Sequence, residues 1–137
     1  MWTHTVRPRF GDVDGLRHIN NCVVPMWFEQ GREPFFRIFS PEFSINFEEW
    51  RLIMAHMDID FVGQLRLGHD VEIRTYVAKL GRSSMTLRQE AWQNGVMGAV
   101  GHCVIVHYDF AAQSSVPLPG HIRAQLEQHL YVEERPA

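Results

Sequence analysis

One long apolar segment, residues 24–39, most constrains what this chain can fold into. Its apolar bulk comes from six large side chains at the spacing of a helix, Trp27, Phe28, Phe35, Phe36, Ile38 and Phe39. Pro25 fits the first position of such a helix, where a missing N–H costs nothing. Pro34 removes a hydrogen bond further along, so we expect a kink or a break between Gln30 and Glu33.

Most of the remaining chain has the pattern of strands. The predicted strands cover residues 2–9, 53–61, 70–80, 83–93 and 96–108, and a C-terminal helix is predicted over 120–130. Asn94-Gly95 predicts a tight hairpin between the last two strands. In the second strand, one apolar face is expected to carry Ile53, Ala55, Met57, Ile59 and Phe61. The other face then carries Met54, His56, Asp58 and Asp60.

This order predicts an α+β fold, with an antiparallel sheet of five to six strands wrapped around one long central helix. With 137 residues, 45% of them hydrophobic and 21% charged, the chain has the size and composition of a single globular domain over residues 1–137. Two cysteines, Cys22 and Cys103, form neither a disulfide framework nor a zinc pattern.

Charge and hydropathy exclude two broad classes. The net charge is −3 and the basic residues are scattered singly, which argues against nucleic acid as a partner. No apolar run approaches about 20 residues and no secretory segment follows Met1, so we expect a soluble, cytoplasmic protein without a membrane partner.

A polar string directly precedes the predicted helix. Ten residues contain Asp12, Asp14, His18, Asn20 and Asn21. Such groups beside a core are costly unless they bond one another or a ligand. From residue type alone, each aspartate is more often a turn or cap residue, and either asparagine can cap the first helical turn.

The string resembles the signature of the hotdog-fold thioesterases, in the branch of the 4-hydroxybenzoyl-CoA and acyl-ACP thioesterases. The matching positions are Asp14, His18, Asn20, Asn21, Trp27 and Glu29. The resemblance covers nearly the whole chain and implies the hotdog fold. It also implies hydrolysis of an acyl thioester of CoA or acyl carrier protein by a homodimer or homotetramer. No metal or separate cofactor is required.

The resemblance also implies roles for individual residues. It selects Asp14 over Asp12 as general base or nucleophile, and the N–H groups around Asn21–Val24 suit an oxyanion. His18 either orients the carboxylate, polarises the carbonyl or protonates the thiolate, or it ties the loop to the sheet. Asn21 has two expected roles, since it can cap the first turn of the helix and it can position the substrate.

Six further positions are candidates for substrate binding: Asn20, Val24, Glu29, Arg82, Ser83 and Ser84. Arg82 and the two serines match a place where similar proteins contact the phosphates and pantetheine of CoA, although they also suit an ordinary turn. Glu29 either pairs with Arg32 on the helix surface or orders water opposite a partner's loop. Val24 replaces an aromatic residue and Arg17 a glycine that are usual in the family, so substrate preference cannot be carried over.

Several alternatives stay open. Cys22 near a helix start is a rival nucleophile. One strand face carries His56, Asp58 and Asp60 and resembles a set of metal ligands. Such a face is more typical of the solvent-exposed side of an antiparallel sheet. A hotdog dehydratase or hydratase, or a non-catalytic acyl-CoA-binding module, would use the same fold for another function.

Overall fold

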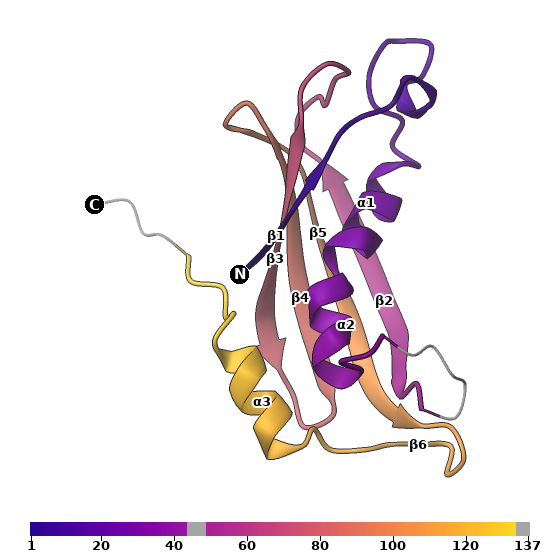
Figure 1. Ribbon diagram of the computed structural model, residues 1–137, viewed down its shortest axis with the longest axis vertical. Coiled ribbons are helices and arrows are strands. Elements are labelled where there is room, and N and C mark those ends of the chain that lie inside the picture. Colours follow the sequence, from indigo (N-terminus) through magenta and orange to yellow (C-terminus); the bar gives the residue numbers. More distant parts are fainter. Residues whose placement is uncertain (44–48, 134–137) are drawn as a thin grey trace.

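The computed structural model describes residues 1–43 and 49–133, and its antiparallel sheet curls around a pair of helices (Figure 1). In spatial order the main strands are β1 (Trp2–Val6), β3 (Val71–Leu80), β4 (Ser84–Gln93), β5 (Val96–Asp109) and β2 (Leu52–Phe61). A short strand, β6 (Ser114–Ser115), pairs with β5. The predicted α+β fold with five to six antiparallel strands is confirmed.

The predicted central helix is two helices, α1 (Val24–Gly31) and α2 (Glu33–Phe39), joined at Arg32. The break lies inside the predicted interval. Pro34 lies in the first turn of α2, where its missing N–H is tolerated, so the chain starts a new helix there. Both helices cover one face of the sheet, as Figure 1 shows.

Two further helices complete the fold. The 3-10 helix η1 (Phe10–Asp12) precedes α1, and α3 (Gly120–Glu127) packs beside β3. Beyond α3, the N–H of Tyr131 donates to the carbonyl of Val77 at 2.8 Å, so the C-terminal segment extends the β3 edge of the sheet.

The prediction that Asn20 or Asn21 caps α1 is wrong. The N-cap is Val23, whose backbone is already helical and whose side chain makes no capping bond. A turn lies between the asparagines and the helix, and Asn20 acts within it: its Oδ1 accepts a hydrogen bond of 2.9 Å from the N–H of Cys22.

The alternation expected along β2 is correct only after Met54. Ile53 pairs with Val106, Met54 with Ile105 and His56 with Val104, so Ala55 is an extra residue in a bulge. The bulge places Met54 on the helix-facing side and Ile53 on the opposite face. From His56 onward the two predicted faces are those observed.

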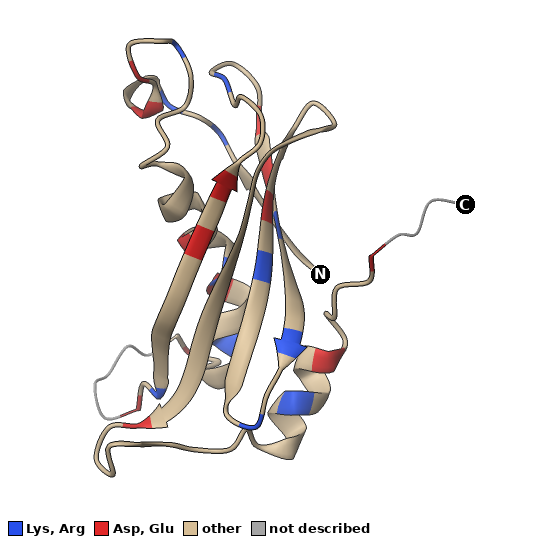
Figure 2. Cartoon of the chain, turned by 180° about the vertical axis from the view of Figure 1, so that it is seen from behind, with Lys and Arg blue, Asp and Glu red and all other residues tan. Residues whose placement is uncertain are grey.

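The β4–β5 hairpin is confirmed, with positive φ angles of 52° at Asn94 and 77° at Gly95. The view from behind shows the strands in front of α1 and α2, so neither helix covers this face of the sheet (Figure 2). Among the described residues, no helix is long and apolar enough to cross a membrane.

Candidate active site

Asp14 lies in a tight turn between η1 and α1, and the backbone of this turn holds one of its carboxylate oxygens. Oδ1 accepts hydrogen bonds from the N–H groups of Leu16 at 2.9 Å and His18 at 3.3 Å. The N–H of Asp14 donates to the carbonyl of His18 at 2.9 Å and closes the turn. The second oxygen, Oδ2, has no hydrogen-bond partner in residues 1–43 and 49–133, so it is open to water or substrate.

Asp12 has a different environment although it is only two residues away. It is 3% exposed, and its carboxylate accepts bonds from the Arg9 N–H at 2.8 Å and Nη2 at 3.3 Å. Its carbonyl accepts the N–H of Asn20 at 2.8 Å. Asp12 therefore stabilises the loop, and Asp14 is the carboxylate of the pair that can face a ligand.

His18 is joined to Asp14 through the backbone. Its main chain forms a bridge with Arg66, and the next residue, Ile19, donates its N–H to the carbonyl of Leu65 at 2.9 Å. These bonds attach the loop to the end of the sheet. Within the described part of the chain, no hydrogen bond joins the imidazole to the Asp14 carboxylate.

The start of α1 presents unpaired backbone donors. Pro25 has no N–H, and the N–H groups of Met26 and Trp27 both donate to the carbonyl of Val23. For the N–H groups of Asn21 and Val24 the described residues provide no acceptor. These two donors lie at the positive end of the α1 dipole, where an anion is stabilised.

One pocket of about 230 Å³ unites these groups, and we call it the loop pocket. It is lined by Asp14, His18, Ile19, Asn21, Val24, Phe61, Gly63, Gln64, Leu65 and Gly98. An open carboxylate oxygen, an imidazole and two N–H donors at one pocket are the groups needed to activate a nucleophile and to stabilise an oxyanion.

Arg82, Ser83 and Ser84 lie at the opposite end of the sheet. Ser84 pairs with Val106, and the carbonyl of Ser83 accepts the N–H of His107 at 2.8 Å, whereas Phe61 lines the loop pocket at the far end of β2. In Figure 1 the β3–β4 connection is at the bottom and the loop before α1 at the top. Within one chain, these residues and Asp14 do not form a common site.

Glu29 and Arg32 line a second, larger pocket, the bend pocket, of about 460 Å³. Its lining is Glu29, Gln30, Arg32, Glu33, Phe36, Phe43, Trp50, Leu52, Ile53, Met54 and Ile105. Glu29 is exposed. The surface ion pair expected between Glu29 and Arg32 is absent from the described residues, because Arg32 turns into the core and is only 4% exposed.

A buried polar cluster that the sequence analysis missed lies beneath the helix break. Arg32 Nη1 donates to Gln89 Oε1 at 3.0 Å, and Gln89 Nε2 donates to Thr75 Oγ1 at 3.0 Å and to the Phe28 carbonyl at 2.8 Å. Thr75 Oγ1 donates to the Gly31 carbonyl at 3.2 Å. We call Arg32, Thr75 and Gln89 the polar belt.

The belt divides the hydrophobic core into two clusters, one around α1 and one around α2. A Cβ on Gly31 would lie 2.7 Å from Ile73, so only glycine allows the helix this close to the sheet. The signal in the sequence was the polar Thr75 and Gln89 at inward positions of otherwise apolar strand faces. The alternation of polar and apolar residues along the strands did not predict that Thr75 and Gln89 would contact the end of a helix.

The acidic face of β2 forms an exposed cluster. Asp58 Oδ2 lies 3.0 Å from His56 Nε2, and Asp58 Oδ1 lies 3.5 Å from His102 Nδ1. The hydrogen bond with His56, with a smaller effect of His102, lowers the pKa of Asp58. No group of three potential metal ligands is found in the described part of the chain.

The two cysteines are free and differ in environment. Cys22 is exposed beside the loop pocket, and Cys103 is buried on β5. Burial raises the pKa of the Cys103 thiol, which keeps it protonated near neutral pH.

Comparison with known proteins places this geometry in a family. The chain matches the model of the thioesterase-like superfamily over residues 8–126. It is 37% identical to a predicted thioesterase from Bacillus stearothermophilus, with a TM-score of 0.90 and coverage of 97% of this chain and 98% of that chain. A comparison with curated protein sequences finds no significant match.

Two more solved structures extend the similarity. A thioesterase from Thermus thermophilus, in complex with coenzyme A and Zn, is 31% identical, with a TM-score of 0.80 and coverage of 93% and 92% of the two chains. A thioesterase superfamily protein from Jannaschia sp. CCS1, 23% identical with a TM-score of 0.82 and coverage of 96% and 94%, shares the fold. With the family model spanning most of its length, this chain belongs to the thioesterase-like superfamily.

Proposed function

We propose that the protein hydrolyses acyl thioesters at the loop pocket. The observation that carries this proposal is that one pocket is lined by Asp14, Asn21 and Val24. The Oδ2 of Asp14 and the N–H groups of Asn21 and Val24 have no hydrogen-bond partner among the described residues. A carboxylate and an oxyanion site are the two requirements for attack on a thioester carbonyl.

In the reaction, Asp14 takes a proton from water as the water oxygen attacks the carbonyl carbon. The oxyanion that forms is bound by the N–H groups of Asn21 and Val24. Its collapse breaks the carbon–sulfur bond, and His18 supplies a proton to the leaving thiolate. The proton taken up by Asp14 then passes to His18, which restores both groups. Asn20 holds the turn that sets these donors in place.

A second course has Asp14 attack the carbonyl directly, which gives a mixed anhydride that water then hydrolyses. Single turnover in heavy-oxygen water tests for the anhydride, since label in the Asp14 carboxylate arises only when water attacks the Asp14 carbonyl of that intermediate. Label in the released acid alone arises in both courses, because water can also attack the acyl carbonyl of the anhydride.

Coenzyme A is the carrier we favour, because the Thermus thermophilus thioesterase, at 31% identity, was solved with it. Acyl carrier protein offers the same phosphopantetheine thioester and is the alternative carrier. The two free cysteines suit a reducing cytoplasm, which we propose as the location.

We further propose a homodimer formed through β2. Among the described strands β2 pairs only with β5, so its other edge is open, and its helix-facing residues Met57 and Phe61 are 44% and 50% exposed. Antiparallel pairing of two copies of β2 would bring the Arg82–Ser84 end of one subunit to the Asp14 end of the other. That arrangement gives Arg82, Ser83 and Ser84 access to CoA.

The test of the reaction is thiol release from a panel of acyl-CoA thioesters by the wild type, Asp14→Asn and Asp70→Asn. Asparagine can still accept the turn N–H groups, so Asp14→Asn should fold but lose about 10²-fold or more in kcat/KM, near 3 kcal/mol. The exposed Asp70, outside β2 and the loop pocket, gives a matched control in Asp70→Asn, which should keep wild-type activity. Equal activity of all three would remove Asp14 from the chemistry.

Other outcomes favour the alternatives. Binding of acyl-CoA without thiol release from CoA or carrier-protein thioesters would favour a binding module. Reversible hydration of an enoyl thioester without thiol release would favour a hydratase.

The shared site is tested by mixing two variants, Asp14→Asn and Arg82→Ala. A mixed dimer would contain one site with both residues intact, so activity should recover after subunit exchange. A lack of recovery in proven mixed dimers would contradict a site shared by Asp14 and Arg82 of the partner subunit.

A further inference from the structure

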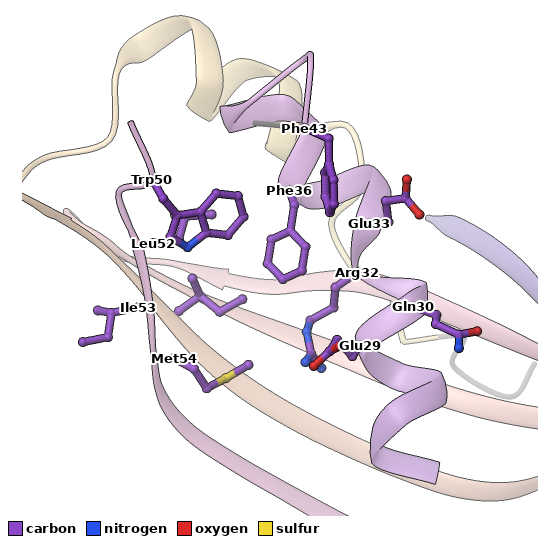
Figure 3. Close-up of a pocket in the computed structure, with 11 residues that line it drawn as sticks. Glu29, Gln30, Arg32, Glu33, Phe36, Phe43, Trp50, Leu52, Ile53 and Met54 are labelled. Atoms are coloured by element: carbon purple, nitrogen blue, oxygen red, sulfur yellow. The ribbon is translucent and has the colours of Figure 1, made fainter. Parts of the chain in front are cut away.

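The bend pocket has aromatic walls and a charged inner end. Phe36 and Trp50 pack edge to face, with ring centroids 5.4 Å apart. Figure 3 shows Arg32 reaching from the helix bend toward the β2 side of the pocket, with Leu52 and Met54 opposite. The lining is thus suited to an aliphatic chain along the α2 and β2 sides, whereas the side at the helix bend is polar and carries Glu29, Gln30, Arg32 and Glu33.

Arg32 is a buried cation with an incomplete set of partners. It is 4% exposed, and Nη1 is occupied by Gln89 Oε1 at 3.0 Å. Its Nε is buried and has no hydrogen-bond partner within residues 1–43 and 49–133. A buried donor left without an acceptor is costly, and a buried charge without a counter-charge is more so.

No acidic residue in the described part of the chain forms an ion pair with Arg32. Glu33 is held by Arg37 at 2.8 Å, and Glu29 is exposed to solvent without forming an ion pair to Arg32 in the described chain. Burial lowers the pKa of Arg32, and the charge of Glu29 acts in the opposite direction. Because Nε is closed off from the pocket, Nη2 is the guanidinium nitrogen that, among the described residues, remains available to an anionic oxygen.

We propose that the bend pocket receives the distal end of the acyl group and that Arg32 binds a terminal carboxylate there. The preferred substrates are then thioesters of dicarboxylic acids, with one carboxyl in the thioester and the other free. This inference rests on the proposed thioester hydrolysis and names its substrate class.

The position of the pocket agrees with this role. The loop pocket and the bend pocket lie between α1 and β2 at their opposite ends, since Val24 and Phe61 line the first and Glu29 and Met54 the second. The eight residues of α1 span about 12 Å at 1.5 Å each. An acyl group of moderate length, bound within one subunit, would span that distance.

The test compares matched thioesters with and without the free carboxylate: succinyl- with butyryl-CoA, adipoyl- with hexanoyl-CoA and suberoyl- with octanoyl-CoA. For at least one pair, wild-type kcat/KM should favour the dicarboxylic member about 10-fold or more, which corresponds to about 1.4 kcal/mol. Arg32→Met should abolish this preference, and Arg32→Lys should restore part of it. Arg7→Met, which removes an exposed arginine paired with Asp70, should leave the preference unchanged.

Circular dichroism and denaturation first show which variants fold, and Arg32→Lys carries the test if Arg32→Met does not. Equal or lower activity on every dicarboxylic member, or a preference that survives loss of the guanidinium, would overturn the inference. If wild-type protein cleaves neither series, the proposed function fails by itself. Calorimetric binding of adipoyl-CoA and hexanoyl-CoA then decides: tighter Arg32-dependent binding of adipoyl-CoA supports the inference, and equal affinity refutes it.

Discussion

The two ends of α1 differ in whether their free backbone groups find hydrogen-bond partners in the protein. Every helix end leaves backbone groups without partners inside the helix. At the start of α1, the N–H groups of Asn21 and Val24 have no acceptor among the described residues, and both residues line the loop pocket. At its end, the carbonyls of Phe28 and Gly31 accept hydrogen bonds from side chains of the sheet.

The difference separates binding from stability along a single helix. The end with satisfied groups is buried beneath the polar belt and holds the helix against the sheet. The other end keeps donors and a carboxylate oxygen available, which is useful only if a ligand fills them. We therefore expect substitutions at the bend to reduce stability and substitutions at the loop pocket to reduce activity.

The largest stability effect should come from Gln89→Leu. This change removes the acceptor of the buried Arg32 and the donor to the Phe28 carbonyl, so we expect a loss of about 3 kcal/mol in the free energy of unfolding. Thr75→Val removes a single hydroxyl from the same belt and should cost about 1 kcal/mol. Urea denaturation measures both, and a near-neutral Gln89→Leu would show that the belt does not stabilise the bend.

A smaller contrast is expected between the two aspartates of the loop. Asp12→Ala removes a buried carboxylate that accepts two bonds from Arg9, and it should cost about 1–2 kcal/mol of stability. Asp14→Asn keeps an acceptor for the turn and should cost below about 0.5 kcal/mol. Thermal unfolding of both variants checks this order. The reverse order would assign the structural role to Asp14.

The smallest effect is expected at Arg17. Its φ of 64° lies in the left-handed region, which favours glycine. Arg17→Gly should relieve the strain and raise stability by about 0.5 kcal/mol, because the gain is partly offset by the greater freedom of glycine in the unfolded chain. Arg7→Gly, outside this turn, is the control and should not stabilise. A melting temperature of Arg17→Gly below that of the wild type would show that the backbone at Arg17 is not strained.

Much of the fold was predictable because its signals are local. Alternation in the strands, the Asn94-Gly95 turn and the break before Pro34 each depend on residues close in sequence. The bulge at Ala55 was not predictable, since it depends on the pairing of β2 with β5. The cap assigned to Asn20 or Asn21 failed because a turn was inserted before α1, and residue preference does not show where a helix starts.

For the site, the sequence by itself determined the chemical groups: a loop with Asp12, Asp14 and His18 that leads into a helix start. Only the tertiary structure decided which aspartate is buried, that Arg82 lies far from Asp14 in one chain, and that Arg32 turns inward to Gln89. These outcomes depend on contacts between residues distant in sequence, whose free energies are set by burial and by the partners that packing supplies. A local sequence pattern contains information on neither burial nor these partners.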